Sequence, residues 1–174
     1  MTKMRFIASV GASLALVACG SSSSSSDADV MFAQMMIPHH EQAIELSDLA
    51  LNPAAGASEA IKQLATQIKG NQDPEIAFMK AWLEERGESS TADDGVDHSS
   101  MMSGMLSLED LDALRLLTGD EFDRAWIAAM IAHHEGAIEM AETVQRDGDD
   151  DEIAALAADI ITAQAAEIEI LQGL

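Results

Sequence analysis

A short stretch of this chain occurs twice, and both copies carry the same potential metal ligands. Residues 36–46 read MIPHHEQAIEL, and residues 130–140 read MIAHHEGAIEM. In each copy a methionine stands three residues before a pair of histidines, and the two pairs hold four of the five histidines of the chain. Matched thioether and imidazole groups predict a metal site. The candidate ligands are Met36, His39, His40, Met130, His133 and His134.

The similarity between the two copies continues on both sides of the histidine pairs. Asp29 and Phe32 precede the first pair at the spacing at which Asp123 and Trp126 precede the second. A further matched set follows each copy, at a spacing that is two residues shorter in the second. It pairs Ile61, Leu64, Ala65, Ile68, Gln72, Glu75 and Ile76 with Ile153, Leu156, Ala157, Ile160, Gln164, Glu167 and Ile168. Each copy is therefore predicted to be a pair of helices.

Apolar residues recur in alternating steps of four and three through both copies, which is typical of the buried seam of a bundle helix. The predicted helices span residues 29–51, 57–86, 121–146 and 151–172, with a short extra helix at 108–117. The fold class is thus all-α, a four-helix bundle built from two repeated helical pairs plus a short connecting helix.

Local signals refine the predicted helix boundaries. Asp120 is a candidate N-cap of the third bundle helix, and Ser107 with Asp110 is a candidate cap of the short helix. Pro38 is expected to kink the first helix just before His39, and Pro74 to bend or split the second helix.

The N-terminus has the pattern of an export signal. Lys3 and Arg5 precede an apolar stretch at 6–17, and Leu16-Val17-Ala18-Cys19 resembles a bacterial lipobox. This pattern predicts a lipoprotein signal peptide at 1–18, a lipid on Cys19 and a Ser-rich tether at 19–26, with the protein anchored to a membrane of the bacterial cell envelope, on its periplasmic or outer face. The alternative is an ordinary secretory peptide in which the cysteine is incidental.

The bundle domain is expected at 27–174, with repeats at about 27–86 and 119–174 and a connector at 87–118. The connector holds further potential ligands, namely His98, Met101, Met102 and Met105. It is predicted either to bind metal itself or to cover the bundle site, and the alternative is a disordered connector whose methionines only lead into the next helix.

Charge excludes one class of partner. The net charge of −22 argues against nucleic acid binding. The acidic run at 147–152 lacks the spacing of an EF-hand loop and is predicted to form a turn and a helix cap. An apolar rim on such a bundle is also compatible with a homodimer.

A known family shares these features. The pattern Asp-x-x-Phe/Trp-x-x-x-Met-x-x-His-His-Glu, present twice, with GMLS at 104–107 and GDEFD at 119–123, resembles the domain of unknown function 305 family of bacterial exported proteins. The resemblance covers about residues 27–174. It implies a ferritin-like bundle and, for some members, periplasmic copper binding linked to copper tolerance. The first copy departs from the second at Pro38 and Gln42, where the second has Ala132 and Gly136.

The ligand types themselves favour copper. On a helical wheel Met36 projects between His39 and His40, and the second copy repeats this. Di-iron bundles use Glu-x-x-His, whereas here a soft thioether replaces the hard carboxylate, which favours Cu(I) while leaving Cu(II) or another divalent metal open. The sequence shows no nucleophile, Gly-rich loop or inward carboxylate set, so a binding protein is predicted rather than an enzyme. The alternatives are a redox protein using a metal or non-covalent haem, and a structural bundle with core histidines.

Overall fold

The computed structural model describes residues 26–91 and 102–174, and these form an all-α fold. Its helices are α1 (Asp27–Leu51), the 3-10 turn η1 (Pro53–Ala55), α2 (Glu59–Arg86), α3 (Leu108–Arg115), α4 (Asp120–Asp147) and α5 (Asp151–Gln172). Within these two ranges no strand is present, which confirms the predicted fold class. None of these helices has the combination of length and apolar character that a membrane span requires. The predicted signal peptide and lipidated Cys19 lie outside the described residues.

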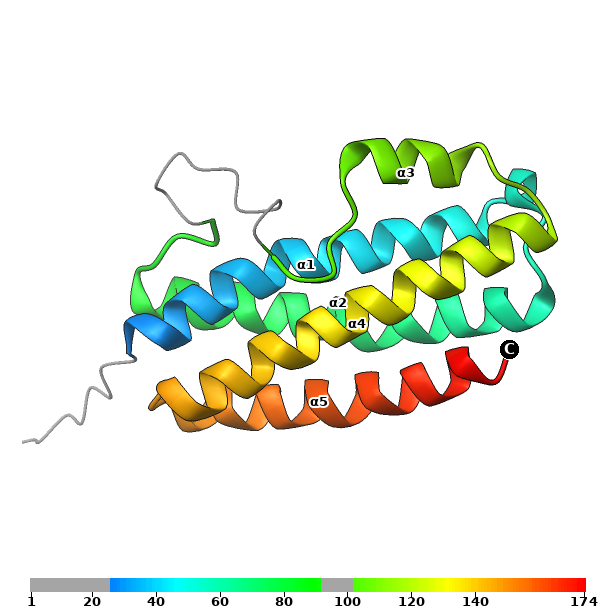
Figure 1. Cartoon of the computed structure of the whole chain (residues 1–174). Coiled ribbons are helices and arrows are strands. Elements are labelled where there is room, and N and C mark those ends of the chain that lie inside the picture. The colour runs from blue at the N-terminus through cyan, green and yellow to red at the C-terminus, as the bar shows by residue number, and fades with distance from the viewer. Residues whose placement is uncertain (1–25, 92–101) are drawn as a thin grey trace, which may run out of the picture.

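The four long helices run side by side as a bundle, and α3 lies on its outside (Figure 1). α1 packs against both α2 and α4, and α5 packs against α4. The two histidine-bearing helices are therefore neighbours, as a site shared between the two copies requires. α3 covers one end of the face formed by α1 and α4, where Leu111 and Leu114 are buried.

The helix boundaries match the predicted ones within two residues. Ser107 caps α3 as predicted, since its Oγ accepts from the Asp110 backbone N–H at 3.1 Å. The prediction that Asp120 caps the third bundle helix is wrong: Gly119 occupies the cap with φ of 59°, and Asp120 is the first helical residue. A glycine suits this position because a side chain would strain the left-handed backbone. Neither Pro38 nor Pro74 interrupts its helix, so α2 is not split.

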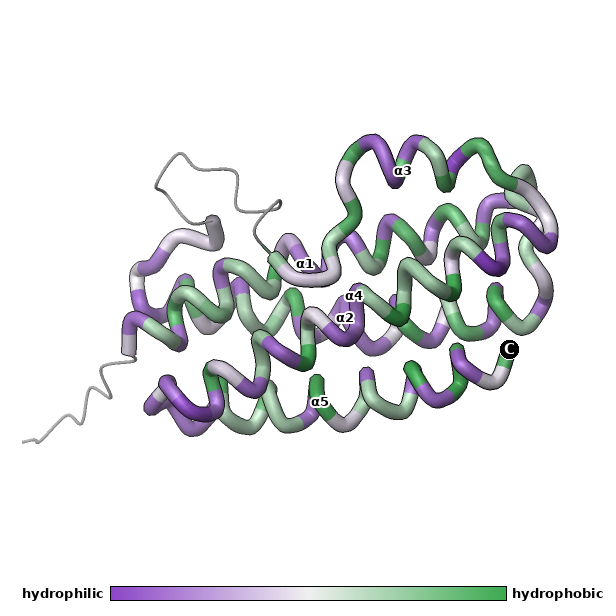
Figure 2. Tube along the Cα trace, in the orientation of Figure 1, coloured by the Kyte–Doolittle hydropathy of each residue, from purple (hydrophilic) through white to green (hydrophobic). Residues whose placement is uncertain are grey.

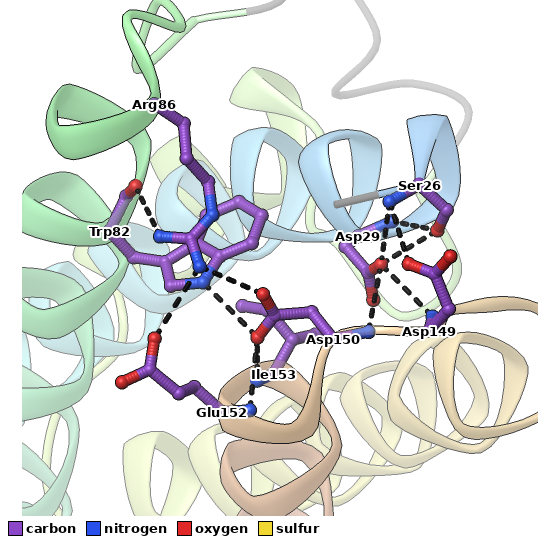
Figure 3. A network of polar contacts seen from close by, with 8 residues as sticks. All are labelled: Ser26, Asp29, Trp82, Arg86, Asp149, Asp150, Glu152 and Ile153. Atoms are coloured by element: carbon purple, nitrogen blue, oxygen red, sulfur yellow. Dashed lines mark hydrogen bonds and ion pairs between the residues drawn. The ribbon is translucent and has the colours of Figure 1, made fainter. Parts of the chain in front are cut away.

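A pair of matched aspartates ties each copy to the other. Asp29 in α1 is buried, and its carboxylate accepts from the backbone N–H groups of Asp149 and Asp150 at 3.1 and 3.3 Å, at the start of α5 (Figure 3). Asp123 in α4 accepts from the backbone N–H of Ser58, the N-cap of α2, at 3.1 Å. Each carboxylate thus meets the unsatisfied donors that a helix N-terminus presents. This reciprocal contact fixes which ends of the two helical pairs lie together.

The acidic run at 147–152 forms a turn and a helix cap, as predicted. Asp150 caps α5 and accepts from the backbone N–H groups of Glu152 and Ile153. Its carboxylate also receives the Arg86 guanidinium at 2.8 Å (Figure 3). Burial alone would raise the pKa of Asp150, but the hydrogen bonds from Ile153 and Arg86 outweigh it and hold the pKa below its usual value.

The apolar core consists of two separate clusters of buried residues, one toward each end of the bundle. Green apolar segments alternate with polar ones along all four long helices (Figure 2). One cluster is built around Trp82 and Phe32, and the other around Trp126 and Phe122. Between the clusters lies a layer of buried polar side chains, which contains the paired histidines.

Candidate metal centre

All four paired histidines are fully buried. His39, His40, His133 and His134 each expose 0% of their surface. The His39 and His133 rings, one from α1 and one from α4, lie with centroids 3.9 Å apart. The structure therefore brings the two histidine pairs together in the middle of the bundle.

Each pair is completed by a carboxylate from the second helix of its own copy. His40 Nε2 lies 2.8 Å from Glu75 Oε2 in α2, and His134 Nε2 lies 2.8 Å from Glu167 Oε2 in α5. Glu167 also accepts from the side-chain amide of Asn71 at 2.9 Å. An ionised carboxylate only accepts hydrogen bonds, so each imidazole donates through Nε2–H. The expectation that no inward carboxylates exist is therefore wrong, because Glu167 is buried and Glu75, which is partly buried, also contacts a buried histidine.

The Nδ1 atoms of all four histidines are buried without a hydrogen-bond partner. His39 donates through Nε2 to the Ser103 carbonyl at 3.2 Å, so three of the four rings have Nε2 engaged and a lone pair left on Nδ1. His133 has neither nitrogen paired. In a metal-ligating histidine, one ring nitrogen usually binds the metal, and the other donates a hydrogen bond that fixes the tautomer.

Two glutamines of the same layer are also unpaired. The side-chain amides of Gln72 and Gln164 are buried, and neither their nitrogen nor their oxygen has a partner. Buried polar groups without partners cost free energy, and proteins normally satisfy them. The layer thus contains more polar atoms than the fold itself satisfies, as expected of a site for a ligand.

The environment keeps the central imidazoles neutral. Burial, followed by the neighbouring His40, lowers the pKa of His39 from 6.5 to about 3. Burial and then His39 lower the pKa of His133 well below its ordinary value. Metals bind the neutral imidazole, so both rings are in the ligand form at physiological pH.

Met36 and Met130 occupy the position one turn before each histidine pair, and both are fully buried. Within the described parts of the chain, no three His, Cys, Asp or Glu side chains already converge as a metal cluster. The acidic residues that follow the two histidine pairs, Glu41 and Glu135, are exposed.

The connector after residue 101 lies across the outside of the layer, held by different means on each helix. Gln42 in α1 exchanges two hydrogen bonds with the Leu106 backbone, at 2.9 and 2.8 Å. Gly136 in α4, at the equivalent place, lets the backbone of Ser103 approach so closely that an added Cβ would lie 1.9 Å from its carbonyl oxygen. The copies therefore differ at Gln42 and Gly136 because α1 and α4 contact the same segment of the connector in different ways. We call this segment the strap.

The connector ligands divide between described and undescribed residues. Met102 is buried, and Met105 is half-buried in a pocket lined by residues of α1 and α3. His98 and Met101 lie outside the described residues. Within the described part of the connector, the Ser103 carbonyl contacts the layer directly, through His39.

The sequence prediction missed four members of the layer, namely Gln72, Glu75, Gln164 and Glu167. The signal was present, since Ile68, Gln72, Glu75 and Met79 follow the same four and three spacing that marks the buried face, and Ile160, Gln164, Glu167 and Leu171 repeat it. Polar residues on a buried seam indicate a functional or paired position.

Comparison with known proteins agrees with this architecture. The family model "Domain of unknown function (DUF305)" matches residues 29–174. A DUF305 fragment from Deinococcus radiodurans is 28% identical, with a TM-score of 0.77, covering 86% of this chain and 95% of that chain. A candidate secreted DUF305 protein from Streptomyces coelicolor is 26% identical, with a TM-score of 0.76 and coverage of 83% and 89%.

A third similar structure is CopM in its Cu(I)-bound form. It is 32% identical, with a TM-score of 0.68, and the match covers 83% of this chain and 93% of that chain. Among curated proteins, none matches this sequence. Since the family model spans nearly all of the described residues, the chain belongs to the DUF305 family.

Proposed function

We propose that this protein captures copper in the bacterial cell envelope, for buffering, tolerance or delivery, and that the histidine layer is its binding site. The observation that carries the proposal is the set of four buried Nδ1 atoms without partners. Three of these rings are held by a hydrogen bond at Nε2, which leaves Nδ1 of each ring available to bind a metal. In this site Glu75 and Glu167 orient imidazoles, and the imidazoles bind the metal.

The thioethers of Met36 and Met130 favour Cu(I) over harder ions. Imidazoles alone accept several divalent metals, whereas methionine sulfur adds affinity mainly for soft cations. The carboxylates that a di-iron bundle would use as ligands are engaged here by His40 and His134. CopM supports copper as the metal, because it has been solved in Cu(I)-bound, Cu(II)-bound and Ag-bound forms.

The geometry weighs against the alternatives. The rings of His39 and His133, with centroids 3.9 Å apart, leave no room for a haem plane between them. A purely structural core would account for the ion pairs of His40 and His134. It gives no reason to bury His133 with both nitrogens unpaired, or the amides of Gln72 and Gln164.

Export and anchoring complete the proposal. The positive start, the apolar stretch at 6–17 and the cysteine of the Leu-Val-Ala-Cys motif favour delivery to the envelope with a lipid on Cys19. A candidate secreted protein among the similar structures supports export. The lipid would hold the bundle at a membrane through the tether at 19–26.

The test is a competition titration of Cu(I) against a chromophoric chelator, with the purified protein and two variants. His133→Gln removes a ligand without breaking any hydrogen bond of the layer, so we expect Cu(I) affinity to fall while the helical content is retained. Glu75→Gln removes an orienting partner and should cost on the order of 10- to 100-fold in affinity.

The matched control is Ser47→Ala, which removes a fully buried polar group that lies in α1 and is hydrogen-bonded only within that helix. We expect this variant to bind copper like the wild type. If His133→Gln and Ser47→Ala both leave Cu(I) affinity unchanged, the layer is structural and the proposed site is wrong.

A further inference from the structure

A second group of methionines, apart from the histidine layer, lines a groove between α1 and α4. The groove encloses about 340 Å³. Its thioethers come from three segments, namely Met31 and Met35 in α1, Met140 in α4 and Met102 in the connector. Glu139 and Asp147 stand on its walls, so negative charge accompanies the sulfur ligands. We refer to this feature as the methionine groove.

Three of the four groove methionines are not ordinary core residues, whereas Met102 is buried. Met31 exposes 59% of its surface, and Met35 and Met140 are only partly buried. Met31 and Met35 are one helical turn apart and so present their side chains on the same face. In the repeat, the positions that match Met31, Met35 and Met140 are Ala125, Ala129 and Leu46. The repeat therefore does not reproduce these three methionines at the other end of the bundle.

The placement of the groove also distinguishes it from the rest of the surface. α3 covers one end of the α1 and α4 face, and the groove lies at the opposite end, between the start of α1 and the end of α4 (Figure 1). Ser103 lines the groove, and its carbonyl accepts from His39. The groove therefore borders the histidine layer at Ser103.

We propose that the methionine groove is a second metal site, which binds a soft monovalent cation, Cu(I) or Ag(I), through the thioethers of Met31, Met35, Met102 and Met140. Thioethers are soft ligands and select such cations over Zn(II) or Ca²⁺. The two carboxylates and the net charge of −22 attract a cation to an exposed site. This site is additional to the proposed copper site in the histidine layer and does not depend on it.

The experiment is a titration of the full chain, labelled with ¹³C at the methionine methyl groups, with Ag(I), which is soft and does not change oxidation state. We expect the methyl resonances of Met31, Met35, Met102 and Met140 to shift together. The variant Met31→Leu, Met35→Leu, Met140→Leu preserves volume and should fold, because such exchanges disturb packing little. It should bind one equivalent of Ag(I) fewer than the wild type, whereas Met79→Leu, a core methionine outside the groove, should lose none.

The His133→Gln variant separates this site from the histidine layer. Its groove resonances should still shift with Ag(I), even if its affinity at the layer is lost. The proposal is overturned if the groove resonances do not respond to Ag(I), if the leucine variant keeps the full stoichiometry, or if the response disappears in His133→Gln. An equal response to Zn(II) would also overturn it, since that would show a carboxylate site and not a thioether site.

Discussion

Replacing Gly136 with alanine should destabilise the bundle, although alanine is the better helix former. An added Cβ at this position would lie 1.9 Å from the carbonyl oxygen of Ser103 and 2.5 Å from its carbonyl carbon. Restoring an ordinary van der Waals separation requires a shift of roughly 1.5 Å. Both contacts are backbone atoms, so no flexible side chain can absorb that shift. The connector must move away from α4.

The magnitude follows from the contacts that this movement breaks. The connector is held by the hydrogen bond between His39 and Ser103 and by two between Gln42 and Leu106. At about 1 kcal/mol each, their loss costs about 3 kcal/mol. The gain in helix propensity from glycine to alanine returns about 1 kcal/mol. The expected net loss in the free energy of unfolding is therefore about 2 kcal/mol.

Gly70 provides a matched control, because it also lies inside a long helix but is exposed, with no atom within 4 Å of an added Cβ. Gly70→Ala should raise the free energy of unfolding by about 1 kcal/mol. Urea unfolding followed by far-UV circular dichroism measures both variants. In a double-mutant cycle, Gln42→Ala should cost less in the Gly136→Ala background than in the wild type.

One result would refute this reasoning. If Gly136→Ala stabilises the protein as much as Gly70→Ala does, the connector does not lie against α4. The described placement of the strap over the histidine layer is then wrong.

Three further predictions concern the metal site, its protonation and the anchor. Replacing Met36 and Met130 with leucine should lower Cu(I) affinity, leave Cu(II) affinity unchanged and cost less than about 1.5 kcal/mol of stability; equal Cu(I) affinity in a chelator competition would make these methionines mere core residues. Because the pKa of His39 falls from 6.5 to about 3 on folding, His39 becomes protonated in the unfolded chain as the pH falls from 7 to 5 but stays neutral in the native state. The free energy of unfolding should therefore fall by about 2 kcal/mol from this residue between pH 7 and pH 5, and less steeply in His39→Gln; equal pH slopes in urea unfolding would contradict this. Cys19→Ser should abolish incorporation of labelled lipid, and persistent labelling would exclude this cysteine as the anchor.

The repeat units and the helices could be predicted from the sequence because their signals are local. Steps of four and three residues place apolar side chains on one face of a helix, whatever that face meets later. The same regularity placed Met36 beside His39 and His40. Short-range cap chemistry identified Ser107, but it failed at Asp120, where the left-handed backbone of Gly119 decides the boundary.

The composition of the histidine layer required the tertiary structure. Glu75 and Glu167 are distant in sequence from the histidines that they contact, and only the packing of α1 on α2 and α4 on α5 brings them together. Their place on the buried seam was visible in the sequence, but their partners were not.

The sequence by itself determined an all-α bundle of two matched helical pairs with buried methionine and histidine. Periodicity and repetition are written along the chain, so they need no knowledge of distant contacts. Tertiary structure alone decided which ring nitrogens remain free, how Gln42 and Gly136 hold the connector over the layer, and that Met31 and Met102 line one groove. These features depend on contacts between segments far apart in the chain, and such contacts form only when the helices pack.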